Sequence, residues 1–171
     1  MSLAHIIGNK IDIIEGFPAV DLSAGANTGD YISIKNAERA AVVFVSGVGT
    51  AGDDPTLTLQ QAQDVAGTGV KALNFMTIYV KQAAVSLAAV TGWTKVTQAA
   101  ANTYTEATAA EQSLIWIVEI DPNELDVANG FDCIRATVAD VGNNAQPGYL
   151  YYLVVPKLKG DPANSPGYIT D

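Results

Sequence analysis

The stretch VVFVSGVGTAGDDPTLTL, residues 42–59, decides between two folds for this chain. It holds Gly47, Gly49 and Gly52 in the spacing G-x-G-x-x-G, directly after an apolar run with the composition of a strand. In a dinucleotide-binding domain this spacing opens a helix, whose N-terminal N–H groups bind the pyrophosphate. Here two aspartates, a proline and the alternating segment TLTLQ follow instead, which is the pattern of a second strand. The stretch therefore predicts a glycine-rich hairpin loop between two strands and argues against a nucleotide-binding site.

Alternation of polar and apolar residues continues outward from this stretch in both directions, and helical periodicity is almost absent. Strands or extended segments are expected at residues 11–22, 31–34, 39–46, 56–60, 73–81, 93–98, 114–120, 131–138 and 149–155. The run 39–46 is apolar almost without interruption, which predicts burial on both faces. Residues 82–90 favour a further strand over a short helix, and residues 107–112 are the best candidate for a helical turn. The pattern predicts an all-β protein, a β-sandwich or jelly roll of about eight to ten short strands with extended N- and C-terminal arms.

The length of 171 residues corresponds to about one domain. We expect an extended arm over residues 1–22, the β-sandwich over residues 23–155, and a tail rich in proline and glycine over residues 156–171. The first residues, MSLAHIIGNKIDII, lack the long apolar segment of a signal peptide. No apolar run approaches the roughly 20 residues that a membrane span requires, so a soluble protein is expected.

The chain is acidic, with 18 aspartates and glutamates against 9 lysines and arginines and a formal net charge of −9. This charge argues against unaided binding to nucleic acid or to an anionic membrane surface, because both repel a negative protein. The single cysteine, Cys133, has no partner for an internal disulfide and lies in an apolar stretch. A buried, unreactive thiol is therefore expected.

Residues that commonly carry catalysis are scarce. His5 is the only histidine and lies near the N-terminus, where a Ser-His-Asp or Cys-His arrangement would lack a rigid support. One histidine and one cysteine cannot supply the usual ligands of a zinc site. Asp53 and Asp54 are adjacent, so we expect their side chains to diverge in a solvated loop. We therefore predict no catalytic residues, no cofactor and no enzymatic activity.

The segment DPNELDVANGFD, residues 121–132, has the acidic composition of a calcium loop but not its spacing. A leucine stands at the fifth position, Asp126 replaces the invariant glycine, and an aspartate closes the loop. An irregular calcium site built from several loops is the alternative, with Asp121, Asn123 and Asp126 as its candidate ligands. Such a site would fit a carbohydrate-binding or hydrolytic β-sandwich, although two tryptophans and four phenylalanines are few for a sugar-binding cleft.

Tyrosines concentrate near the C-terminus. Tyr149, Tyr151 and Tyr152 lie in one predicted strand, in which Tyr151 faces opposite to the residues before and after it, and Tyr168 lies in the tail. Packing in the core with the hydroxyls at the surface is the simpler interpretation. The other is a subunit interface, because tyrosine is enriched at interfaces. These four tyrosines are the interface candidates that the sequence offers.

Two segments carry a resemblance to a known family. Residues 53–75 read DDPTLTLQQAQDVAGTGVKALNF, and residues 118–155 read VEIDPNELDVANGFDCIRATVADVGNNAQPGYLYYLVV. The patterns D..GTG.KAL.F and LD...GF......VADVG.NAQ within them resemble small virion proteins of tailed bacteriophages and prophages.

The resemblance implies a β-rich, non-enzymatic structural protein: a head decoration or cement protein that binds the shell of the major capsid protein. It implies a homo-oligomer, with the trimer favoured, that is assembled into the virion in the cytoplasm of the bacterial host. It transfers no catalytic residue, and a head fibre or a connector component would fit it equally. We expect residues 1–22 or 156–171 to contact a neighbouring subunit or the shell, since segments that order on binding can cover large surfaces.

Overall fold

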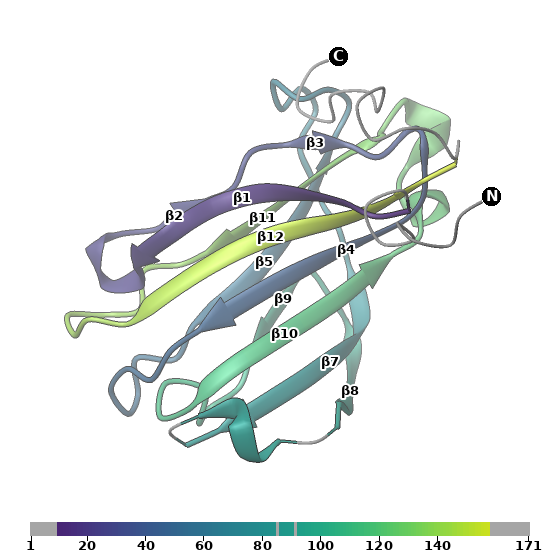
Figure 1. The fold of residues 1–171 in the computed structure, drawn as a ribbon. Helices are drawn as coiled ribbons and strands as arrows, with labels where there is room; N and C mark the ends of the chain where they lie inside the picture. Colours follow the sequence, from purple (N-terminus) through teal and green to yellow (C-terminus); the bar gives the residue numbers. More distant parts are fainter. Residues whose placement is uncertain (1–9, 85, 91, 158–171) are drawn as a thin grey trace.

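The computed structural model describes residues 10–84, 86–90 and 92–157, which form two antiparallel β-sheets packed face to face (Figure 1). The all-β sandwich predicted from the alternation is therefore confirmed. Helical structure in these residues consists of short 3-10 turns: η2 (Leu22–Ala24), η3 (Leu87–Ala89), η4 (Pro122–Glu124) and η5 (Val127–Asn129). None of the described helices is long and apolar enough to cross a membrane.

Six strands form the first sheet, called sheet A, and the rest form sheet B. Sheet A contains, in spatial order, β1 (Asp12–Asp21), β12 (Pro147–Pro156), β4 (Ala37–Ser46), β10 (Ser113–Ile120), β7 (Phe75–Ala83) and β8 (Thr94–Ala101). Sheet B contains β2 (Asn27–Thr28), β11 (Cys133–Val138), β5 (Thr56–Ala62) and β6 (Lys71–Ala72), with β3 (Ile32–Ser33) also on β11 and β9 (Thr103–Thr105) also on β5. The strands outnumber the predicted eight to ten because β2, β6 and β9 are too short to produce an alternation in the sequence; β3 lies within the predicted segment 31–34.

The central strands of sheet A, β4 and β10, show why one side of this sheet differs from the other. Their inward side chains, which include Phe44 and Trp116, are buried between the two sheets. Their outward side chains are mostly half-buried, and Figure 1 shows no described element over that side of the sheet. The prediction that residues 39–46 are buried on both faces is therefore wrong: only the inward face meets a second sheet.

The inward side chains of both sheets form one continuous core. A smaller cluster of Tyr31, Ala62 and Cys133 lies on the outer side of sheet B, where the guanidinium of Arg135 stacks 4.4 Å from the Tyr31 ring centroid. The side chain of Cys133 is buried there, as expected for an unreactive thiol.

The N-terminal segment belongs to the sandwich rather than to an arm. Residues 12–21 form β1, which pairs antiparallel with β12 along the edge of sheet A. Register shifts occur between Glu15 and Phe17 and between Phe17 and Val20, where glycine and proline interrupt the strand. The prediction of an extended arm over residues 1–22 is therefore wrong for residues 12–21, which form an edge strand of the sandwich. Residues 1–9 and 158–171, which include most of the predicted tail, lie outside the described residues.

Two local predictions in the ambiguous middle of the chain need correction. Residues 82–90 are not one strand, because β7 ends at Ala83 and η3 follows. Residues 107–112 form successive tight turns, with Ala109 N–H donating to Glu106 O and Gln112 N–H donating to Ala109 O, and no regular helix. Alanine-rich sequence suits both helix and extended structure, so local propensity did not decide either segment.

Candidate functional site

The glycine-rich segment 47–52 is a loop, and no helix follows it, because β5 begins at Thr56. The predicted loop between two strands is confirmed, but it is not a hairpin loop. Its flanking strands, β4 and β5, lie in different sheets, so the loop carries the chain across the sandwich. The segment has no helix N-terminus to bind a phosphate.

The two aspartates after this loop hold neighbouring loops in place. Asp53 Oδ2 accepts a hydrogen bond from Asn144 Nδ2 at 2.9 Å, whereas Asp54 Oδ1 accepts one from the Ala110 N–H at 2.9 Å. Gly49 N–H donates in turn to the Ala110 carbonyl at 2.7 Å. The carboxylates diverge as predicted, but they are half-buried and bonded within the protein rather than simply solvated.

Asp121, the first candidate calcium ligand, stabilises the turn that follows it. Its Oδ1 accepts hydrogen bonds from the Asn123 N–H at 3.0 Å and from Asn123 Nδ2 at 2.8 Å. Glu124 completes a capping box by accepting from the Asp121 N–H. The other carboxylate oxygen pairs with Arg39 NH1 at 2.8 Å. Both oxygens of Asp121 therefore already have protein partners.

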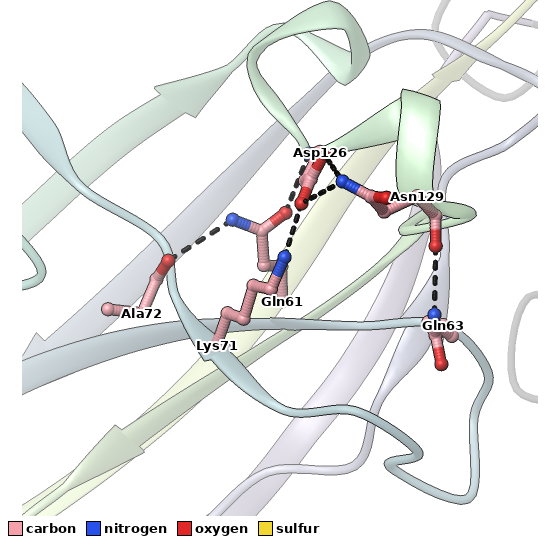
Figure 2. A network of polar contacts seen from close by, with 6 residues as sticks. All are labelled: Gln61, Gln63, Lys71, Ala72, Asp126 and Asn129. Carbon is pink, nitrogen blue, oxygen red and sulfur yellow. Dashed lines mark hydrogen bonds and ion pairs between the residues drawn. The ribbon is translucent and has the colours of Figure 1, made fainter.

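Asp126, the third candidate ligand, belongs to a separate polar network (Figure 2). It forms an ion pair with Lys71, and Asn129 Nδ2 donates to its two oxygens at 2.8 and 3.0 Å. Gln61 accepts from the Asp126 N–H at 2.8 Å and donates to the Ala72 carbonyl at 3.1 Å. This network ties the segment around η5 to the β5–β6 hairpin.

The acidic segment therefore fixes loops within the described structure. Asp121 and Asp126 turn to different basic partners, Arg39 and Lys71, and the described residues contain no group of three or more His, Cys, Asp or Glu side chains that could hold a metal ion. The composition of residues 121–132 reflects capping and ion pairing, which sequence spacing alone does not distinguish from metal ligation.

The pKa of Asp126 gives this network a pH dependence. Hydrogen bonds from Lys71 and then Asn129 hold the pKa of Asp126 below its usual value of 3.8. A carboxyl whose pKa is lower in the folded than in the unfolded protein stabilises the fold above 3.8, and this contribution is lost as the pH falls through the folded pKa.

We expect Asp126→Asn to lower the thermal unfolding midpoint near neutral pH, because the ion pair with Lys71 is lost. The difference from wild type should narrow as the pH falls from 3.8 through the lower folded pKa of Asp126, since the wild-type carboxyl becomes protonated over this range. Thermal melting across the acid range measures both effects. Glu38→Gln, at an exposed side chain of β4, is the control and should change the midpoint little. A difference that stays constant with pH would contradict the prediction.

Two cavities could in principle hold a small molecule. One of ≈ 310 Å³ lies beside η4 and η5, where Lys35 Nζ is 3.6 Å from an Asp132 oxygen and Lys157 Nζ donates to the Lys35 carbonyl at 3.2 Å. The other, of ≈ 260 Å³, lies against β7 and β8 and includes Tyr104 and Glu106 in its lining. In the first cavity, Lys35 is thus paired with Asp132 and Lys157 with a backbone carbonyl.

The tyrosines predicted as interface candidates fall on two sides of sheet A. Tyr152 is fully buried in the core. Tyr149 and Tyr151 lie half-buried on the outer side, with their ring centroids 5.5 Å apart in an edge-on arrangement. Tyr168 lies outside the described residues. Among the three described tyrosines of this set, Tyr149 and Tyr151 are thus placed where a partner could reach them.

The outer face of sheet A is the best candidate for a functional surface. Residues paired in register across neighbouring strands point to the same side, so the pairing defines which side chains share this face. Its apolar members are Ile13 on β1, Tyr149, Tyr151 and Leu153 on β12, Ala41, Val43 and Val45 on β4, Ile115 and Ile117 on β10, and Tyr79 on β7. Ile13 is 60% exposed, and the others are half-buried. A continuous apolar area of this kind marks an interaction site on soluble proteins.

Sequence reasoning found two tyrosines of this face but missed its aliphatic centre. Val43 and Val45 lie in the run 39–46 that was predicted to be buried on both faces, and Ile115 and Ile117 lie in the predicted strand 114–120. The sequence does carry a signal for this face, because a strand that is apolar on both sides is expected to be covered on both sides. The described structure covers one face only.

Comparison with models of known protein families finds no matching family, and comparison with curated proteins finds no matching relative.

Proposed function

We propose that this protein is a non-enzymatic structural protein that self-associates and serves as a capsid decoration protein of a tailed bacteriophage, bound to the head shell. One structural observation carries the proposal: within the described residues, no element covers the apolar outer face of sheet A. Such faces bind macromolecules, whereas small-molecule sites are concave with a few converging polar groups. The two segments that resemble small virion proteins support the phage assignment.

The rest of the chain suits this role. A decoration protein has to stay dispersed before assembly, and the net charge of −9 keeps copies apart in solution. It also has to be rigid once bound, and a sandwich with one continuous core provides that rigidity. The apolar face, which carries few charges, is then the part of an otherwise acidic surface where close contact costs least.

The test combines two measurements on purified protein: its mass in solution by light scattering, and its cosedimentation with head shells that lack it. We expect an oligomer that cosediments with the shells. A monomer that ignores the shells would contradict the proposal and favour the carbohydrate-binding alternative.

Matched lysine variants locate the surface responsible. Val43→Lys places a charge at the centre of the outer face of sheet A and should weaken self-association by about 100-fold or more, because an unpaired ammonium would be buried. Thr137→Lys places the same charge on the outer side of sheet B, near the end of β11, and should leave self-association unchanged. Equal behaviour of the two variants would exclude the outer face of sheet A as the contact.

A further inference from the structure

We propose that the outer face of sheet A binds a second copy of itself through a two-fold axis that runs nearly along the strands, with Glu15 of each copy facing Lys95 of the other. The inference rests on the self-association in the proposed function and adds the partner, the symmetry and the contacts.

One row of side chains crosses the whole sheet and carries the argument. The pairing joins Glu15 to Tyr151, Tyr151 to Val43, Val43 to Ile117, Ile117 to Tyr79, and Tyr79 to Lys95. Because paired residues share a face, all six side chains point outward. The order across the sheet is therefore acid, tyrosine, aliphatic, aliphatic, tyrosine, base.

This order reads the same from either end, apart from the sign of its charges. The middle of the six-stranded sheet lies between β4 and β10. A two-fold axis placed there, parallel to the strands and between the two facing sheets, reverses the order of the strands. Each row of one copy then faces the same row of the other copy. It sets Glu15 against Lys95, Tyr151 against Tyr79 and Val43 against Ile117. The contact is self-complementary, as a two-fold interface has to be.

The neighbouring row supports the same axis. It runs from Tyr149 through Val45 and Ile115 to Lys81. Under the same axis, Val45 of one copy faces Ile115 of the other. Lys81 of one copy comes near the ring of Tyr149 of the other, which is a favourable cation–π arrangement. Two facing sheets commonly pack with their strands within about 30° of each other, which matches an axis that follows the strands approximately.

The size of the face suits a stable pair. Six strands about 4.8 Å apart and three rows about 7 Å apart give a flat area on the order of 500 Å² for each copy. Two copies then bury at least on the order of 1,000 Å² together, close to the lower limit for a specific interface. Two of the three rows have an apolar centre with charges nearer the edges, which is the usual layout of an interface, whereas the third row carries the exposed Glu119 near the end of β10.

Charge reversal at the two edges tests the pairing. Glu15 and Lys95 are both exposed, so reversing their charges spares the core. Glu15→Lys alone and Lys95→Glu alone should each weaken dimerisation about tenfold, since each dimer then holds two like-charge contacts. The double variant Glu15→Lys/Lys95→Glu should restore wild-type affinity. Sedimentation equilibrium measures the affinities, and circular dichroism checks that each variant is folded.

Mixing the two single variants gives a sharper result. One then carries lysine at both edges and the other glutamate at both edges, so we expect the mixture to form a mixed dimer more tightly than either variant pairs with itself. A wild-type mass of twice 17.8 kDa is expected. A trimer, as the resemblance implies, or a dimer that none of the reversals affects, would overturn the two-fold contact while leaving self-association intact. A monomer that still cosediments with shells would overturn the two-fold contact and the proposed self-association, but not the proposed binding to the shell. A monomer that does not bind shells would overturn the proposed function as well.

Discussion

Replacing Trp116 with alanine is expected to lower the free energy of unfolding by about 3–5 kcal/mol. Trp116 is fully buried at the centre of sheet A, and its ring centroid lies 5.6 Å from that of Phe44 on β4 and 4.7 Å from that of Tyr104 on β9. Because β9 belongs to sheet B, this side chain joins the two sheets. Its Nε1 also donates to Gln82 Oε1 at 2.8 Å, and in the variant this oxygen loses its donor. The loss is a large fraction of the stability of a typical domain, about 5–15 kcal/mol.

The second tryptophan provides the control for this experiment. Trp93 is 45% exposed and contacts Lys81, whose Nζ lies 4.6 Å from the ring centroid. Trp93→Ala should cost no more than about 1 kcal/mol, the value of an exposed cation–π contact. Urea unfolding followed by far-ultraviolet circular dichroism measures both variants without relying on tryptophan fluorescence. Similar losses for the two variants would mean that Trp116 does not join the sheets.

Replacing Tyr152 with phenylalanine should cost about 1–3 kcal/mol, because a buried hydrogen-bonding network loses its central hydroxyl. β11 pairs with β3 at Cys133 and Ile134 and with β2 at Thr137 and Val138, which leaves Ala136 between them. The Tyr152 hydroxyl fills this gap: it accepts from the Ala136 N–H at 2.9 Å and donates to the Asp30 carbonyl at 3.1 Å.

The surroundings of the Tyr152 hydroxyl explain why phenylalanine is a poor substitute. Burial raises the pKa of Tyr152 far above its usual value, so the hydroxyl keeps its proton and can donate it. A Cβ atom on Gly29 would lie 2.8 Å from the hydroxyl oxygen and 3.0 Å from the Ala136 carbonyl oxygen. The site is therefore closely packed around the hydroxyl, and the backbone groups of Ala136 and Asp30 lose a partner that water would not readily replace.

Tyr151→Phe is the matched control, since it makes the same chemical change one residue away. Tyr151 lies half-buried on the outer side of the sheet, and its loss of a hydroxyl should change the free energy of unfolding by less than about 0.5 kcal/mol. Both variants should be unfolded in urea at one protein concentration, because self-association also contributes to apparent stability. Equal effects would show that the Tyr152 hydroxyl does not bridge β12 and β11.

The fold class could be predicted from the sequence because alternation is a local property. Segments such as 56–60 and 131–138 carry their period of two within a few residues, and the absence of a helix after Gly52 could be read directly. The same holds for the buried thiol of Cys133, which sits among apolar neighbours in the chain. The short strands β2, β6 and β9 could not be predicted, since two or three residues contain no period, whereas β3 lies within the predicted segment 31–34.

The roles of the acidic residues depended on contacts between distant parts of the chain. Asp121 pairs with Arg39 and Asp126 pairs with Lys71, and no spacing within residues 121–132 indicates either partner. An aspartate appears the same in the sequence whether its carboxylate caps a turn, pairs with a base or binds calcium. The tertiary structure distinguishes these roles because it shows where each oxygen finds its hydrogen-bond donors.

The sequence by itself determined that this protein is built from strands, where most of them lie, and that its glycine-rich stretch is a loop. Only the tertiary structure decided that residues 12–21 join the sheet, that Tyr152 is buried while Tyr151 faces outward, and that the apolar outer side of β4 and β10 has no described layer over it. The physical reason is that hydrophobicity records the tendency of a side chain to leave water, but not which surface it will meet. An apolar residue that packs in the core and one that lies on an uncovered sheet face look alike in the sequence.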